Sequence, residues 1–79
     1  MAMGRLPKQD KDQVDNQVET WRIKAGLSRQ QLAEAVGVHY QTIGYIERGE
    51  YAPTLALALR LAQVLNCKVE DLFNIKGDK

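Results

Sequence analysis

The chain has 79 residues, of which 44% are hydrophobic and 27% charged, and its formal net charge is +1. At this length we expect one small domain without a separate sensor or catalytic domain. No apolar run approaches the ~20 residues of a membrane span, and the amino-terminal stretch lacks the apolar segment of a secretory signal, so we expect a cytoplasmic protein with no membrane partner.

Residues 1–14 mix charged and amide side chains with few apolar ones, which predicts a flexible amino-terminal tail. A basic arm that reaches into a nucleic-acid groove is the sharper alternative. Charge balance argues against it, because acidic side chains in and next to this segment match the basic ones. These residues are Arg5, Lys8, Lys11, Asp10, Asp12 and Asp15.

The folded domain is expected over residues 15–75, followed by a frayed end over 76–79. Its first helix should begin near Asn16, with Glu19 three residues on as a capping-box partner. Gly26 should end this helix. Apolar residues at helical spacing predict one buried face, made of Val14, Val18, Trp21 and Ala25.

The next helix has a clear start at Ser28. Its hydroxyl can accept a hydrogen bond from the backbone of Gln31, whose side chain can return one. Leu27 and Leu32 are placed as a hydrophobic staple across the same boundary. Gly37 supplies the positive φ that a tight helix end needs.

A second helix follows after a short turn. Ile43 and Ile46 give it one apolar stripe, and Gly49 ends it. Polar and aromatic side chains occupy the rest of its surface. Two short helices joined by a tight turn, with polar groups at the start of the second, are typical of a helix-turn-helix, which indicates DNA binding. We call this second helix the reading helix.

Two further helices complete an all-α fold of five helices. Thr54 is a natural cap for a helix over 55–65, where Leu and Ala favour a helix although large and small residues alternate. This segment is apolar on nearly every side except at Arg60 and Gln63, so we expect it to be the central buried element. A short helix over 69–73 should follow.

From about Asn16 to Phe73 the chain resembles the lambda-repressor and Cro-like regulators of the XRE family. The resemblance depends on several motifs in order: Leu-Ser-x-x-Gln-Leu-Ala, the Gly-Val turn, Gln-Thr-Ile, Ile-Glu-Arg-Gly, Pro-Thr-Leu and Glu-Asp-Leu-Phe. It implies a compact lambda-repressor-like domain that binds double-stranded DNA and regulates transcription. His39 departs from the family, which usually has a capping Ser or Thr at this position.

The amino-terminal side chains of the reading helix are the candidates for reading bases in the major groove. Gln41 leads, because an amide can form a bidentate pair with adenine. Tyr40, Thr42 and Tyr45 are further candidates, with surface packing as the alternative for each. Gly44 leaves two interpretations open, close approach to DNA or a neighbouring helix, and a tolerated helix defect.

Three residues are candidates for phosphate contacts. Arg29 matches the family position that contacts a phosphate, where the helix start also favours negative charge. Arg48 is the second, although a cation complementing the helix dipole explains it without DNA. His39 is the third, with a weak helix cap as its alternative. By resemblance, Arg22 and Glu47 form a structural ion pair that links the first helix to the reading helix.

One such domain makes few base contacts, so we expect a homodimer on a near-palindromic operator, with half-sites ~34 Å apart. Leu72, Phe73 and Ile75 are the candidates for the dimer interface, and their alternative role is to close the core. A repressor is the first expectation. An antitoxin of a toxin–antitoxin pair and a helix-turn-helix adaptor that binds proteins are the alternatives.

Other chemistry has little support in the sequence. One cysteine and one histidine provide neither an internal disulfide nor a Cys/His metal site, so we expect no metal and no cofactor. Cys67 is interpreted as a half-buried filler between helices. We expect neither an enzyme nor a small-molecule ligand, because no phosphate-binding glycine loop or suitable carboxylate pair is visible.

Overall fold

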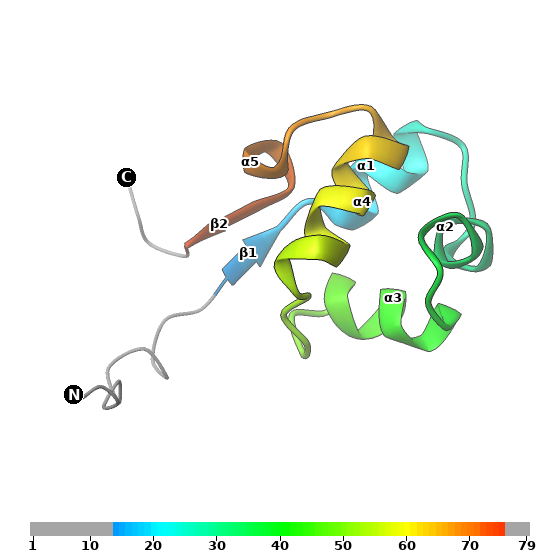
Figure 1. Ribbon diagram of the computed structural model, residues 1–79, viewed down its shortest axis with the longest axis horizontal. Helices are drawn as coiled ribbons and strands as arrows, with labels where there is room; N and C mark the ends of the chain where they lie inside the picture. The colour runs from blue at the N-terminus through cyan, green and yellow to red at the C-terminus, as the bar shows by residue number, and fades with distance from the viewer. Residues whose placement is uncertain (1–13, 76–79) are drawn as a thin grey trace.

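The computed structural model describes residues 14–75, which form five helices and a two-stranded sheet. Figure 1 shows α4 crossing the centre of the molecule, with α2 and α3 on one side and the two strands on the other. No helix in this range is long and apolar enough to cross a bilayer. In chain order the elements are β1 (Val14–Asn16), α1 (Val18–Lys24), α2 (Arg29–Val36), α3 (Tyr40–Glu47), α4 (Leu55–Leu65), α5 (Val69–Leu72) and β2 (Phe73–Ile75).

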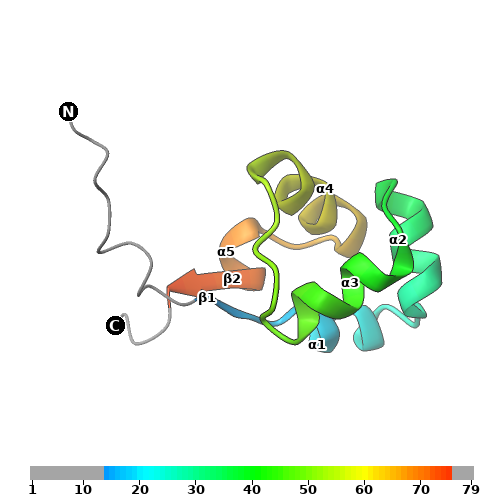
Figure 2. The same ribbon diagram turned by 90° about the horizontal axis from the view of Figure 1, so that it is seen from below.

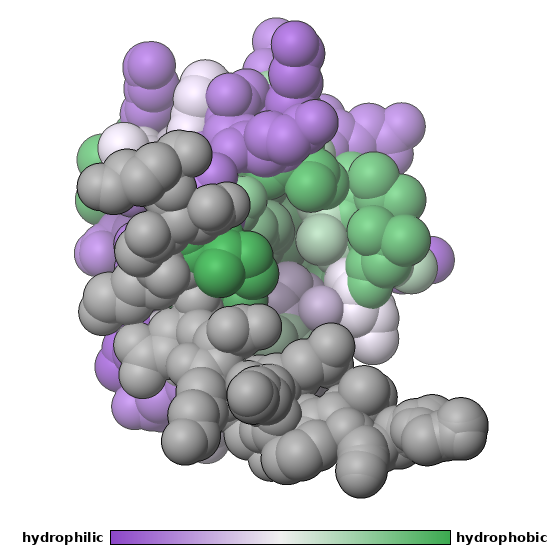
Figure 3. Space-filling model, turned by 90° about the vertical axis from the view of Figure 1, so that its left-hand side faces the viewer, coloured by the Kyte–Doolittle hydropathy of each residue, from purple (hydrophilic) through white to green (hydrophobic). Residues whose placement is uncertain are grey.

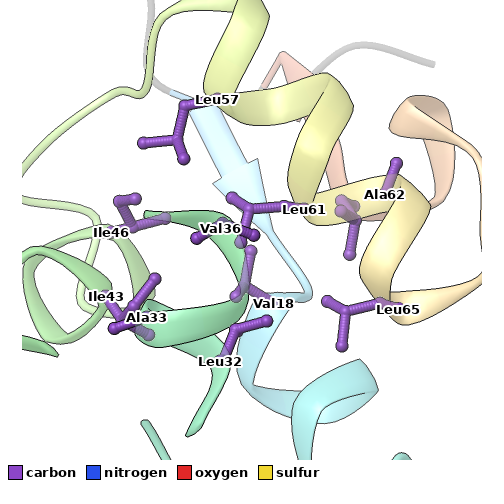
Figure 4. Packing of buried hydrophobic residues seen from close by; sticks show 11 residues of the cluster. Val18, Leu32, Ala33, Val36, Ile43, Ile46, Leu57, Leu61, Ala62 and Leu65 are labelled. Carbon is purple, nitrogen blue, oxygen red and sulfur yellow. The ribbon is translucent and has the colours of Figure 1, made fainter. Parts of the chain in front are cut away.

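The core takes apolar side chains from all five helices, and α4 contributes the most (Figure 4). The central place predicted for α4 is confirmed, but its other face is open: Leu55 is 70% exposed and Leu59 53% exposed. The helix is therefore central to the core without being buried on every apolar side. The largest fully buried side chains are Val18, Leu32, Ile43, Ile46, Leu61 and Leu72.

The two strands correct the expectation of an all-α fold. β1 and β2 pair antiparallel, with Val14 opposite Ile75 and Asn16 opposite Phe73. The backbone N–H of Gln17 extends this ladder by donating to the Leu72 carbonyl at 2.8 Å. The ladder joins the segment before α1 to the segment after α5. Backbone N–H and C=O groups near Asn16, which were predicted to bond within a helix, are paired across the strands instead. Val14 therefore lies in a strand and not on a helix face.

The first helix accordingly begins later than predicted. It starts at Val18 with Gln17 as its N-cap, and the Gln17 side chain makes no capping hydrogen bond. Asn16 Oδ1 accepts from the Val18 backbone at 3.1 Å, but the capping box expected between Asn16 and Glu19 is not formed. The cap predicted for α2 is confirmed: Ser28 Oγ accepts from the Gln31 backbone at 3.0 Å, and the Gln31 side chain accepts from the Ser28 backbone at 2.8 Å. The start of α2 is therefore as predicted, whereas α1 starts two residues later than predicted.

The carboxyl-terminal end corrects one site prediction. Leu72 is fully buried in the core, so it takes the alternative role of closing the core and is not available to a dimer partner. Phe73 is half-buried and Ile75 is 47% exposed. Leu72 is the last residue of α5, and exposure increases along the strand that follows it.

Candidate nucleic-acid interface

The helix-turn-helix consists of α2 and α3, which are joined by the turn at Gly37 (Figure 2). Gly37 has a φ of +80°, so the left-handed helix end predicted there is confirmed. Val38 is half-buried beneath the turn. Ile43 and Ile46 bury one side of α3 against the core, and this packing leaves the other side of the helix at the surface.

His39 caps the start of α3. Its Nδ1 accepts a hydrogen bond from the Gln41 backbone at 3.2 Å, and its ring stacks on Tyr40 with centroids 4.8 Å apart. The capping alternative for His39 is therefore present in the structure. Its predicted phosphate contact stays a prediction.

The exposed face of α3 gathers most of the predicted base readers. One hollow is lined by residues from α3 and from the start of α2, among them Arg29, Tyr40, Gln41, Tyr45 and Arg48. Tyr40, Gln41 and Tyr45 are exposed. Thr42 is half-buried and does not line the hollow, so the structure places it apart from the other candidates.

Arg48 lies at the end of α3 and interacts with two neighbours. Its guanidinium carbon lies 5.2 Å from the centroid of the Tyr45 ring, and its Nη2 lies 3.3 Å from Glu50 Oε1. A cation over an aromatic face is attracted by the ring quadrupole. These contacts hold Arg48 along the same face as Tyr45, where both remain exposed.

The ion pair expected from the resemblance is present. Arg22 Nε lies 2.7 Å from Glu47 Oε2, and the two side chains are only 10% and 2% exposed. Arg22 Nη1 also donates to the Leu27 carbonyl at 2.9 Å. A buried carboxylate at the end of a helix opposes the helix dipole and requires a cation, which Arg22 supplies from α1.

The structure adds a second cation that the sequence analysis missed. Arg29 Nε donates to the other oxygen of Glu47, Oε1, at 2.8 Å, and Arg29 Nη2 lies 4.0 Å from Glu19 Oε2. The hydrogen bond and the charge of Glu47 raise the pKa of the Arg29 guanidinium. The need of Glu47 for cations was visible in the sequence, and it could have indicated more than one partner.

Asn16 is a further residue whose role was missed. Its Nδ2 donates to the Ile46 carbonyl at 2.9 Å, and its Oδ1 accepts from the Val18 backbone at 3.1 Å. One side chain therefore joins β1, the start of α1 and the end of α3. Carbonyls in the last turn of a helix lack partners within the helix, and the Ile46 carbonyl also accepts from the Gly49 backbone at 3.0 Å, so the Asn16 amide is its second donor.

The model of a family described as helix-turn-helix matches residues 18–72 of this chain. This chain belongs to the XRE-type helix-turn-helix family. Members of this type are DNA-binding transcriptional regulators. The matched residues run from the start of α1 to the end of α5.

Two relatives align with this chain over most of their own length. An HTH-type transcriptional regulator of Bacillus subtilis, YgzD, is 43% identical over 60 residues, which cover 76% of this chain and 91% of YgzD. The control protein C.SmaI of Serratia marcescens is 38% identical over 69 residues, covering 87% of this chain and 82% of that protein.

Solved structures share the fold of this XRE-type chain. The restriction-modification controller protein C.AhdI of Aeromonas hydrophila superposes with a TM-score of 0.66 and 29% identity, covering 70% of this chain and 83% of C.AhdI. The biofilm regulator SinR, solved in complex with DNA, superposes with a TM-score of 0.64 and 27% identity, covering 68% of this chain and 87% of SinR.

Proposed function

We propose that the protein is a repressor that reads a near-palindromic operator as a homodimer, with the exposed face of α3 in the major groove. One observation carries the proposal: Gln41, Tyr45 and Arg48 share a single exposed hollow on a helix whose other side is fixed in the core. Occupying an operator would block polymerase without any catalytic step. The likeness to SinR, which was solved in complex with DNA, supports DNA as the partner.

Each residue of the hollow has a role that its chemistry suits. Gln41 pairs with the N6 and N7 edge of adenine in two hydrogen bonds. Tyr40 and Tyr45 place a hydroxyl or a ring edge against a base or a thymine methyl. Thr42, which lies outside the hollow, contacts a base or a phosphate. Arg48, which is exposed at the end of α3, binds a phosphate.

The test begins with selection of bound duplexes from a random DNA pool. Gln41→Ala should then lose discrimination at one base position by about 1–3 kcal/mol, because the bidentate pair is lost. Gln63→Ala is the matched control, since Gln63 is an exposed glutamine on α4, outside the hollow. No enriched sequence in the selection, or equal effects of the two substitutions, would contradict the proposal.

The homodimer follows from the reach of the reading helix. An eight-residue helix is ~12 Å long, about a third of a ~34 Å turn of DNA, so tight operator binding needs a second copy. Exposed apolar side chains are available for such a contact on β1, β2 and α4, and Figure 3 views the side that carries the strands. They are Val14, Leu55, Leu59 and Ile75, with half-buried Phe73 beside them in sequence.

The position of this apolar face favours a second copy as its occupant. The strands and the first turn of α4 lie toward the end at which α3 finishes (Figure 1). A partner placed there would bring the ends of the two reading helices together on one side of a duplex. Leu72, which is buried, is no longer part of the proposed interface.

Control of restriction–modification genes is a narrower candidate. Two comparisons favour it: the 38% identity to the control protein C.SmaI and the structural likeness to the controller C.AhdI. The selected operator decides this candidate when it is located in the source genome. A match upstream of neighbouring endonuclease and methyltransferase genes would support it, and a match elsewhere would contradict it.

A further inference from the structure

The Glu47 carboxylate receives one guanidinium on each of its oxygens. Arg22, from α1, binds Oε2 at 2.7 Å, and Arg29, the first residue of α2, binds Oε1 at 2.8 Å. Glu47 is the last residue of α3, and its side chain is 2% exposed. The end of the reading helix is therefore held from two different helices.

Arg29 is largely neutralised inside this cluster. Its guanidinium contacts Glu47 through Nε and lies 4.0 Å from Glu19 through Nη2. Counting Arg22, the cluster contains two arginines and two glutamates, and its charges balance. A guanidinium paired in this way adds less to the attraction of phosphates than a free one does.

The same side chain lies beside the residues proposed to read bases. Arg29 is 48% exposed and lines the hollow that also contains Gln41 and Tyr45. The planar guanidinium directs its Nε toward Glu47 while its Nη2 lies near Glu19, whereas a lysine ammonium is a point charge without this fixed geometry. Small displacements of a reading side chain matter because hydrogen bonds weaken steeply with misalignment.

We propose that Arg29 is a positioning residue, whose Nε hydrogen bond to Glu47 sets the register of α3 in the groove and thereby the discrimination between bases. This inference depends on the proposed function, because it assumes that α3 reads DNA. It replaces the simple phosphate contact that the resemblance implies for Arg29. The two roles differ in what they predict for a substitution that keeps the charge.

The experiment compares Arg29→Lys with the wild type on the selected operator and on a scrambled duplex of the same composition, at one ionic strength. If Arg29 is a positioning residue, Arg29→Lys should lower the ratio of operator affinity to scrambled-duplex affinity about tenfold or more. Binding to the scrambled duplex should change less than about twofold, since the positive charge is kept. Arg60→Lys, at an exposed arginine on α4, is the matched control and should leave the ratio unchanged.

A second readout uses the free protein. Amide resonances of α3 around Gln41 and Tyr45 should shift in Arg29→Lys, while those of α4 stay in place. A wild-type ratio, equal losses on both duplexes, or a lower ratio with unshifted α3 resonances would overturn the inference. If the wild-type protein itself shows no preference for any duplex, the proposed function fails, and that result is distinct from a failure of Arg29 alone.

Discussion

Arg22 and Glu47 form a buried ion pair between the first helix and the end of the reading helix, with Nε and Oε2 2.7 Å apart. Arg22 also donates to the Leu27 carbonyl just before α2. The helix dipole disfavours a carboxylate in the last turn, and burial adds a desolvation cost. The pair offsets both costs, and in doing so it fixes where α3 ends relative to α1.

Removing one partner of this pair should destabilise the fold. Arg22→Met should lower the free energy of unfolding by about 2–4 kcal/mol in urea titrations, because Glu47 loses its buried partner. A double-mutant cycle with Glu47→Gln should give a coupling energy above about 1 kcal/mol. Arg60→Met, at an exposed site, should change stability by less than about 0.5 kcal/mol. Coupling below about 0.5 kcal/mol would remove the pair as a link between the helices.

Asn16 gives a second stability prediction. Asn16→Ala should cost about 1–2 kcal/mol, because the Ile46 carbonyl loses a donor and the Val18 backbone loses an acceptor. Asn16→Asp keeps the acceptor but places a negative charge at the end of α3, so it should not restore stability. Thermal unfolding of the three proteins tests this order. An aspartate variant as stable as the wild type would show that the contact to α3 is unimportant.

The helices were predictable where local chemistry decides them. The Ser28 and Gln31 cap, the left-handed Gly37 and the Thr54 cap all depend on residues within a few positions of each other. The strands were not predictable, because each has three residues and pairs with a segment at the other end of the domain, as Val14 does with Ile75. Nothing local in so short a strand indicates its partner.

In the candidate site, too, local patterns were predictable from the sequence and contacts between helices were not. The exposed face of α3 followed from helical periodicity, since Ile43 and Ile46 determine which side is buried. The contact between Arg29 and Glu47 did not, because it depends on how α2 crosses α3. Leu72 failed as an interface residue because its exposure depends on the packing of α5 against α4, which composition does not reveal.

Gly44 allows the two interpretations left open by the sequence to be separated. An added Cβ would meet only the Arg48 guanidinium, at 3.2 Å, and the far end of that side chain can move. Gly44→Ala should therefore raise the free energy of unfolding by about 0.5–1 kcal/mol, the usual gain in helix propensity. A stabilised variant with unchanged operator affinity identifies a tolerated defect. A stabilised variant with weakened binding identifies close approach to DNA, and loss of stability would contradict the prediction.

Cys67 should be a slow-reacting thiol. Burial, and then the negative charge of Asp71, raise the pKa of the Cys67 thiol, and the reactive species is the thiolate. Alkylation by iodoacetamide at neutral pH should be slower for the folded protein than for the urea-unfolded chain. The rate for the folded protein should level off at a higher pH than the rate for the unfolded chain, because the pKa of the Cys67 thiol is raised in the folded protein. Equal rates in the two states at neutral pH would contradict this assignment.

The exposed apolar face predicts how the protein should assemble. Replacing Leu55 and Leu59 together with Gln should convert a dimer into a monomer in sedimentation experiments, because two large apolar side chains would no longer leave water on association. Ile23→Gln is the control: Ile23 is 60% exposed but lies on α1, outside the proposed interface. The double variant should bind a full operator more weakly and a half-site as well as the wild type does. Equal sedimentation of all three proteins as dimers would place the interface on another face.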